Sequence, residues 1–172
     1  ERSSVGYLLA TQDAQRGSMA GALLGALGSN RVLREERTGV LLDKVSRGDL
    51  ALVYNVLGSY AQARIDQGAP LAIVEPQDYT LVILRTAVIP RTSPHPQQAR
   101  RFLDYLLSAR GQQVLSREAR LMPIISSQPR PDAGPGRSRR PIQLGPGLLV
   151  YLDALKRRQF LQAWKSSVSP GP

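Results

Sequence analysis

The chain of 172 residues has a hydrophobic share of 42%, which suits one globular domain or two small lobes. Its formal net charge of +10 favours anionic partners, but few aromatic residues and no zinc-ligand or RNA-binding motif argue against nucleic acid. No apolar run reaches the roughly 18 residues that a bilayer-spanning helix needs, so we do not expect a membrane-embedded protein. The lack of cysteine excludes disulfides and thiolate metal sites.

Small hydroxyl residues precede an apolar run near the start of the chain, which predicts a helix beginning at Ser3 and Ser4. The free N–H groups and the positive end of the helix dipole favour an anion there, with Arg2 adding charge; a plain N-cap is the simpler interpretation. A second helix is predicted over residues 17–27, ending at Gly28. Its small residues indicate close packing against a neighbouring element.

The stretch from residue 45 to residue 61 is predicted to end a third helix, form a buried strand and open a fourth helix. Gly48 suits a helix C-terminus because glycine tolerates positive φ. The apolar run at 50–53 is short enough for a core strand of a parallel sheet. Tyr54 and Asn55 follow it, at the strand end where open α/β sheets bind ligands. The alternative is that Tyr54 lies at the edge of the core and Asn55 is an N-cap.

Helical spacing is also found at residues 38–45 and 56–65, and the second of these helices begins near Ser59 and Tyr60. We include both side chains among the candidate ligand contacts, because they line the same predicted turn as the strand end before them. Tyr60, like other amphipathic aromatic residues, also fits a place at the edge of the core.

Two further strands are predicted after this helix, a short one at 71–74 and a long one at 80–89. The polar turn between them contains Asp78 and Tyr79, which we expect at the hinge or the rim of a ligand site. The second run is rich in β-branched residues and unusually continuous, which favours a strand that crosses between two lobes.

A loop containing His95, the sole histidine, leads into a helix whose apolar stripe includes Phe102 and Leu107. Because it lies between two prolines, we expect His95 to be exposed. A further short helix is predicted from Gly111. Paired carboxylates, metal-spaced histidines and nucleophile motifs do not stand out, so we expect no catalytic residues, no metal site and no cofactor.

The last part of the chain begins with residues 128–141, which are rich in Pro, Gly and Arg and predict a mobile surface segment. It ends in residues 148–164, which predict one amphipathic helix opened by Pro146. Docking of this helix on its own domain is a simpler interpretation than binding to a membrane surface.

The order of these elements resembles the later half of periplasmic solute-binding proteins of ABC transporters, in the type II family that includes iron(III)-binding proteins. The matching pieces are the serine-containing helix start at 3–6, residues 45–51 with the tyrosine turn, the long strand at 80–89, the helix at 99–108, Gly111-Gln112-Gln113, and Pro123. The helix followed by Gly111-Gln112 is the most specific of these.

The resemblance implies an α/β fold with two lobes joined by a hinge, of which this chain is expected to contain only the later half. It implies four segments: 1–79 as a second-lobe α/β segment, 80–127 as a crossing strand with first-lobe helices, 128–145 as a flexible segment, and 146–172 as a C-terminal amphipathic helix. The cleft contacts implied are Ser3, Ser4, Tyr54, Asn55, Ser59, Tyr60, Asp78 and Tyr79.

The function implied is non-catalytic binding of a small solute in the cleft and its delivery to an ABC transporter membrane permease. The location implied is the periplasm, although no signal peptide is recognised in this chain. Iron-binding relatives carry adjacent tyrosines after the strand, whereas the corresponding residues 55–60 here read Asn-Val-Leu-Gly-Ser-Tyr, with a single tyrosine. Ferric ion prefers several hard oxygen ligands, so we favour an anion over ferric ion. Ferric-ion binding and a ligand-sensing module of a signal-transduction system are the alternatives.

Overall fold

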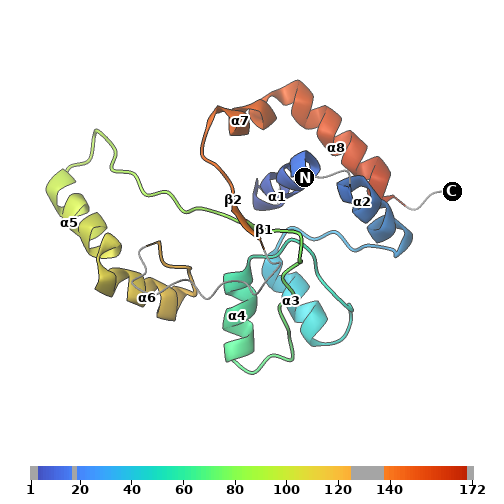
Figure 1. Cartoon of the computed structure of the whole chain (residues 1–172), viewed down its shortest axis with the longest axis horizontal. Helices are drawn as coiled ribbons and strands as arrows, with labels where there is room; N and C mark the ends of the chain where they lie inside the picture. The colour runs from blue at the N-terminus through green and yellow to red at the C-terminus, as the bar shows by residue number, and fades with distance from the viewer. Residues whose placement is uncertain (1–3, 17–18, 125–137, 170–172) are drawn as a thin grey trace. The chain divides into compact units, whose positions relative to one another are not determined.

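A computed structural model describes residues 4–16, 19–124 and 138–169 of the chain. In chain order, the elements are α1 Ser4–Arg16, α2 Met19–Ser29, α3 Thr38–Ser46, α4 Gly58–Asp66, β1 Thr80–Val82, α5 Pro96–Leu107, α6 Ala109–Ala119, β2 Arg139–Pro141, α7 Pro146–Leu149, the 3-10 turn η1 Val150–Leu152, and α8 Ala154–Val168 (Figure 1). They divide into two compact units, one of residues 1–55 with 142–172 and one of residues 56–141. None of the described helices combines the length and apolar character needed to cross a bilayer.

The first unit is built from helices at both ends of the chain. α2 packs against α8, and the two run side by side in Figure 1. Gly28 is buried at this contact, because a Cβ there would lie 3.0 Å from the Ser167 carbonyl oxygen and 3.0 Å from the Val168 carbonyl carbon. The close contact is thus at Gly28, which was predicted to end the helix and instead lies inside α2, whereas Gly21 and Gly25, which belong to the small residues predicted to pack closely, have no atom within 4 Å of a Cβ position.

The second unit contains α4, α5 and α6 and a pair of parallel strands. β1 pairs with β2, with Thr80 opposite Arg139 and Val82 opposite Pro141. Arg139 also binds the Glu75 carboxylate, with 2.8 Å between Nη2 and Oε1. β2 lies at the end of the segment predicted to be mobile. Most of that segment, residues 128–137, lies outside the described residues.

The junction of α5 and α6 explains the Gly111-Gln112 pair. A Cβ at Gly111 would overlap the Tyr105 carbonyl oxygen and lie 2.8 Å from Leu106 Cα, so only glycine fits. The buried Gln112 side chain donates to the Leu106 carbonyl at 2.7 Å and accepts from the Ile124 N–H at 2.7 Å. These two residues thus tie α5, α6 and the following chain together.

Several predicted strands are wrong in the described part of the chain. Residues 50–53 and 71–74 are not strands, and Leu52 is 66% exposed and Val74 85% exposed. The long strand predicted at 80–89 is reduced to β1. A strand forms only where its backbone N–H and C=O groups pair with a neighbouring strand. Within the described residues, this pairing joins β1 to β2.

Two helical predictions also need correction. The C-terminal helix is broken at Asp153, whose non-helical backbone and carboxylate, accepting from the N–H groups of Leu155 and Lys156, begin α8 anew. α5 is confirmed as a helix, but its apolar stripe is not covered within the described residues, because Phe102 is 60% and Leu107 48% exposed. His95 is exposed, as predicted.

Candidate functional site

The turn after residue 53 is held by a buried carboxylate of α1. The Tyr54 hydroxyl donates to Asp13 Oδ2 at 2.8 Å, and the Asn55 side-chain amide donates to the same oxygen at 3.1 Å. Asp13 is 8% exposed, whereas Tyr54 is 38% exposed. Both predicted residues are therefore brought together by a third that sequence reasoning missed. Part of the Tyr54 ring is exposed to solvent, whereas its hydroxyl is hydrogen-bonded to the buried Asp13 carboxylate.

Asn55 has a backbone conformation that few residue types adopt. Its φ is +59°, in the left-handed region that asparagine tolerates better than most non-glycine residues. The alternative that Asn55 caps α4 is wrong, because Leu57 holds the N-cap position and the Asn55 side chain binds Asp13 instead. The left-handed backbone and the hydrogen bond together fix the direction in which the chain leaves the turn.

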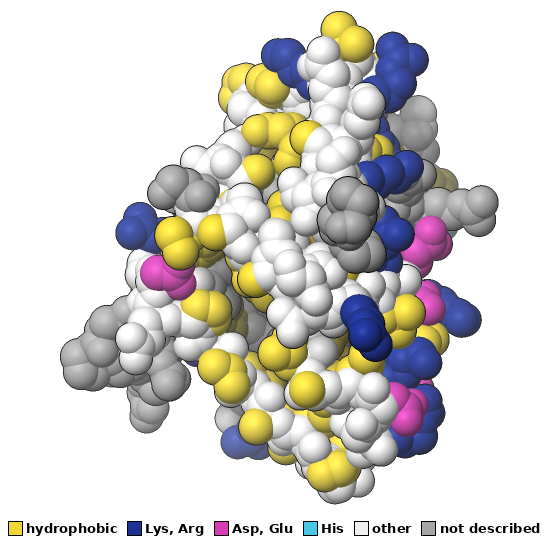
Figure 2. All heavy atoms as spheres, turned by 90° about the vertical axis from the view of Figure 1, so that its right-hand side faces the viewer, with side chains coloured by type: hydrophobic (Ala, Val, Ile, Leu, Met, Phe, Trp, Pro, Cys, Tyr) yellow, Lys and Arg dark blue, Asp and Glu magenta, His cyan; other side chains and the backbone are white. Residues whose placement is uncertain are grey.

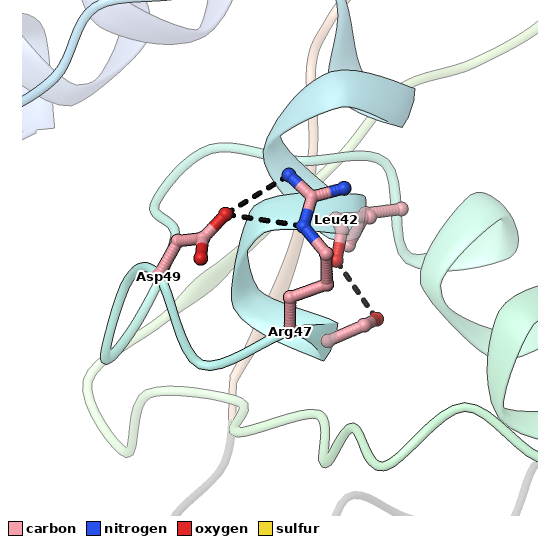
Figure 3. A network of polar contacts seen from close by, with 4 residues as sticks. Leu42, Arg47 and Asp49 are labelled. Atoms are coloured by element: carbon pink, nitrogen blue, oxygen red, sulfur yellow. Dashed lines mark hydrogen bonds and ion pairs between the residues drawn. The ribbon is translucent and has the colours of Figure 1, made fainter.

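The end of α3 delivers the chain to this turn. Gly48 has φ of +79°, as its predicted place at a helix C-terminus requires, and its N–H donates to the Val45 carbonyl at 3.0 Å. Arg47 closes the loop by binding one oxygen of Asp49 through Nε at 3.1 Å and Nη2 at 2.9 Å (Figure 3). Hydrogen bonds between near neighbours in the sequence thus fix the chain between α3 and Asp49, before it reaches Tyr54.

Ser4 lies far from the Tyr54 turn. It is the first residue of α1, whereas Asp13 is nine residues further along that helix, a rise of about 13 Å. Ser4 instead lines a cavity of about 210 Å³ together with Tyr7, Tyr151 and Arg157. A solute of a few heavy atoms does not reach both places. Ser3 lies outside the described residues.

The other predicted contacts belong to the second unit. Ser59 and Tyr60 lie in the first turn of α4, which contains no acidic residue, and Tyr60 is 51% exposed. The N-cap of α4, Leu57, offers no side-chain oxygen to its N–H groups. Asp78 is exposed, and its carboxylate accepts from the Tyr79 N–H at 2.8 Å, which makes a local turn.

The candidate residues at the start of α4 offer hydrogen-bond donors. Across residues 4–16, 19–124 and 138–169, no three His, Cys, Asp or Glu side chains gather as a metal ion would require. At the start of α4, uncapped N–H groups and a serine hydroxyl offer hydrogen-bond donors with the positive end of the helix dipole.

Sequence signal for the missed Asp13 was weak. It is one of three consecutive polar residues in α1, Thr11, Gln12 and Asp13, and all three are buried. A run of three polar residues covers nearly a full turn of helix, so helical spacing could not say which of them faces the interior. Its partners are 41 and 42 residues away in the chain, beyond the reach of any local pattern.

Comparisons with known proteins agree on one class. The sequence model of a family described as bacterial extracellular solute-binding protein matches residues 3–118. Among solved structures, the crystal structure of the substrate binding protein of the ABC transporter from Agrobacterium tumefaciens is similar, with a TM-score of 0.77 and 28% sequence identity. The similarity covers 97% of this chain and 51% of that chain, so this chain spans about half the length of that protein. No curated protein sequence matches the chain.

Proposed function

Because this chain belongs to the family of bacterial extracellular solute-binding proteins, we propose that it takes part in binding a small solute for an ABC transporter. It shares the α/β fold of a substrate-binding protein of that class over nearly its whole length. The role is non-catalytic: the solute is bound outside the cytoplasmic membrane, in the periplasm, and passed to the membrane permease. The observation that carries this proposal is the agreement of the family match and the structural likeness over the same elements, α1 to α6.

The solute we propose is a small anion. The formal net charge of +10 supports this choice, and the view in Figure 2 shows more Lys and Arg than Asp and Glu side chains, most of them toward its right-hand edge. The start of α4 adds local support, because the Ser59 hydroxyl and the N–H groups of Gly58 and Ser59 are donors without an acidic residue in the same turn, whereas the N–H groups of Tyr60 and Ala61 bind the Leu57 carbonyl. Asp78 and Tyr79 stay proposed as rim residues of the second unit.

Tyr54 is the contact that we propose in the first unit. Asp13 holds its hydroxyl, and the part of its ring that stays exposed offers an apolar surface. The Tyr54 hydroxyl and the Asn55 amide both donate to the Asp13 carboxylate, so these two donors do not face an anion. We therefore propose Tyr54 as an apolar contact of the first unit.

Native mass spectrometry of the protein, purified without refolding, tests the proposed function. We expect a small bound mass that is lost on unfolding, and equilibrium titration with a panel of organic and inorganic anions then identifies the class. Ser59→Asp places a negative charge at the start of α4 and is expected to weaken anion binding at least tenfold. Gln67→Asp adds the same charge at the other end of α4 and serves as the control. An empty protein that binds no member of the panel contradicts the proposal.

A further inference from the structure

We propose that a cluster of exposed leucines in the C-terminal segment docks the protein on the surface of an anionic lipid bilayer. The leucine cluster consists of Leu149 in α7, Leu152 in η1 and Leu155 in the first turn of α8. These residues belong to the first unit and lie near the red end of the chain in Figure 1. The proposed contact is with the bilayer surface, and it does not rest on the transport function.

The leucine cluster presents a large apolar surface to solvent. Leu149 is 63% exposed, Leu152 70% and Leu155 56%. Leu149 and Leu152 are three residues apart in successive helical turns, which places them on one side of the segment, and η1 contacts α8, where Leu155 follows. Single apolar residues are normal on a protein surface, whereas a group of them marks a surface that a partner covers.

The other side of α8 is used within the first unit. α8 packs against α2, Val168 is buried, and the Phe160 ring meets the Tyr7 ring edge to face at a centroid distance of 5.7 Å. Leu155 and Phe160 are five residues apart, which separates them by about 140° around the helix axis. The predicted docking of this helix on its own domain therefore uses the Phe160 side and leaves Leu155 exposed.

Cations beside the leucine cluster indicate which surface covers it. Lys156 and Arg158 are exposed, and Arg158 neighbours Leu155 on the helix surface because it is three residues further along α8. The acidic side chain of this segment is Asp153, whose carboxylate accepts from the N–H groups of Leu155 and Lys156. An anionic bilayer fits this combination, since its acyl region accepts leucine side chains and its head groups attract lysine and arginine.

A second copy of the chain fits the same surface less well. Each copy has a formal net charge of +10, so two copies repel each other, and a symmetric contact would bring the same cations together. An uncharged lipid surface would cover the leucines and leave the cations without a counter-charge. The anionic bilayer satisfies both parts of the patch.

Flotation of the protein with phospholipid vesicles tests the proposal. We expect binding to vesicles made of equal parts of phosphatidylglycerol and phosphatidylcholine, and little binding to vesicles of phosphatidylcholine alone. Added salt should weaken the binding, because it screens the contact between the cations and the head groups. Hydrogen exchange of the bound protein should slow in residues 146–158, where the leucine cluster and the cations lie.

A matched pair of leucine variants tests the apolar part. Leu152→Ser is expected to weaken vesicle binding about tenfold, because it removes a side chain that the bilayer buries. Leu52→Ser changes a leucine of the same unit that is 66% exposed and lies outside the cluster, so it should bind vesicles as the wild type does. Equal losses in the two variants overturn the leucine cluster.

A second pair tests the cations. Lys156→Gln combined with Arg158→Gln is expected to weaken binding to the anionic vesicles about tenfold. Arg85→Gln combined with Arg91→Gln removes the same charge from exposed residues of the second unit and should keep most of the binding. Equal losses in the two double variants overturn the role given to the α8 cations.

The absence of vesicle binding by the wild type, or equal binding to both kinds of vesicle, also overturns the proposal. The first of these results leaves a protein as the partner of the leucine cluster. All the variants change exposed side chains, and circular dichroism checks that each is folded. The assay contains no solute, and Ser59→Asp should bind vesicles as the wild type does, so failure of this proposal is distinguished from failure of the transport proposal.

Discussion

The hydroxyl of Tyr54 lies 2.8 Å from the carboxylate of Asp13, although 41 residues separate them in the chain. The bond joins a partly exposed aromatic side chain to a carboxylate that is almost fully buried. The exposed part of Tyr54 is therefore positioned by α1, and the direction of the turn depends on a helix that begins 50 residues earlier in the chain.

Loss of this bond should lower stability measurably. Tyr54→Phe removes the donor to a buried carboxylate oxygen and keeps the ring, so we expect the free energy of unfolding to fall by about 1–3 kcal/mol. Tyr60→Phe, at a residue that is 51% exposed, is the matched control and should change it by less than about 0.5 kcal/mol. Urea unfolding measures both. Equal stabilities for the two variants would contradict the role given to Asp13.

The contact of α2 with α8 predicts opposite effects at two glycines of one helix. Gly28→Ala forces a Cβ against the backbone of Ser167 and Val168 and should cost about 1–3 kcal/mol. Gly25→Ala meets open space in the same helix and should stabilise the protein by up to about 1 kcal/mol through helix propensity. Thermal unfolding distinguishes them. A stabilising Gly28→Ala would show that the two helices do not approach this closely.

The side-chain amide of Gln112 should contribute more to stability than the side-chain amide of Gln113. Gln112→Ala leaves the Ile124 N–H and the Leu106 carbonyl without this partner, and we expect a loss of about 1–3 kcal/mol. Gln113→Ala, at the next and exposed residue of α6, should have little effect. Hydrogen exchange at the Ile124 amide gives a direct readout, because its protection should fall in the first variant alone. Unchanged protection would refute the bridge.

Stability should fall in acid partly through Asp66. Its pKa is lowered by a hydrogen bond from the Gln62 side chain, and further by the Arg120 guanidinium. A carboxyl group with a lowered folded-state pKa stabilises the fold above its unfolded-state pKa, and this contribution is lost as the pH falls through the folded-state value. Carboxyl NMR titration should show the lowered pKa, and Gln62→Ala should raise it.

The matching stability experiment uses Asp66→Asn. This variant has no carboxyl group at the position, so its stability should decline less steeply than that of the wild type below about pH 4. Because the side chain is exposed, added salt should reduce the difference. An identical acid dependence in the wild type and the variant would show that the interactions around Asp66 do not favour its charged form.

Helices were predictable from the sequence because their hydrogen bonds are local. The spacing of apolar residues identified α3 and α5, and a further short helix was predicted from Gly111, within α6. A glycine marked the end of α3 at Gly48, where the backbone has the expected positive φ. The pair Gly111-Gln112 was the most specific family signal, and the structure supplies its reason in the tight junction of α5 and α6. The class of protein followed from the order of these elements and is confirmed by the family match.

The strands and the surroundings of the candidate site depend on contacts between residues that are far apart in the chain. Local sequence patterns do not reveal such contacts. The apolar run at 50–53 has the composition of a strand, but a strand also needs a partner ladder, and the described structure gives that ladder to β1 and β2. The role of Asp13 was equally hidden, because its partners are 41 and 42 residues away. Sequence by itself determined the approximate positions of α1 to α6 and of the turn at Tyr54, since those features arise from neighbours in the chain. Tertiary structure decided that Ser4 and Tyr54 lie in different places, because the rigid length of α1 separates Ser4 from Asp13, which binds Tyr54.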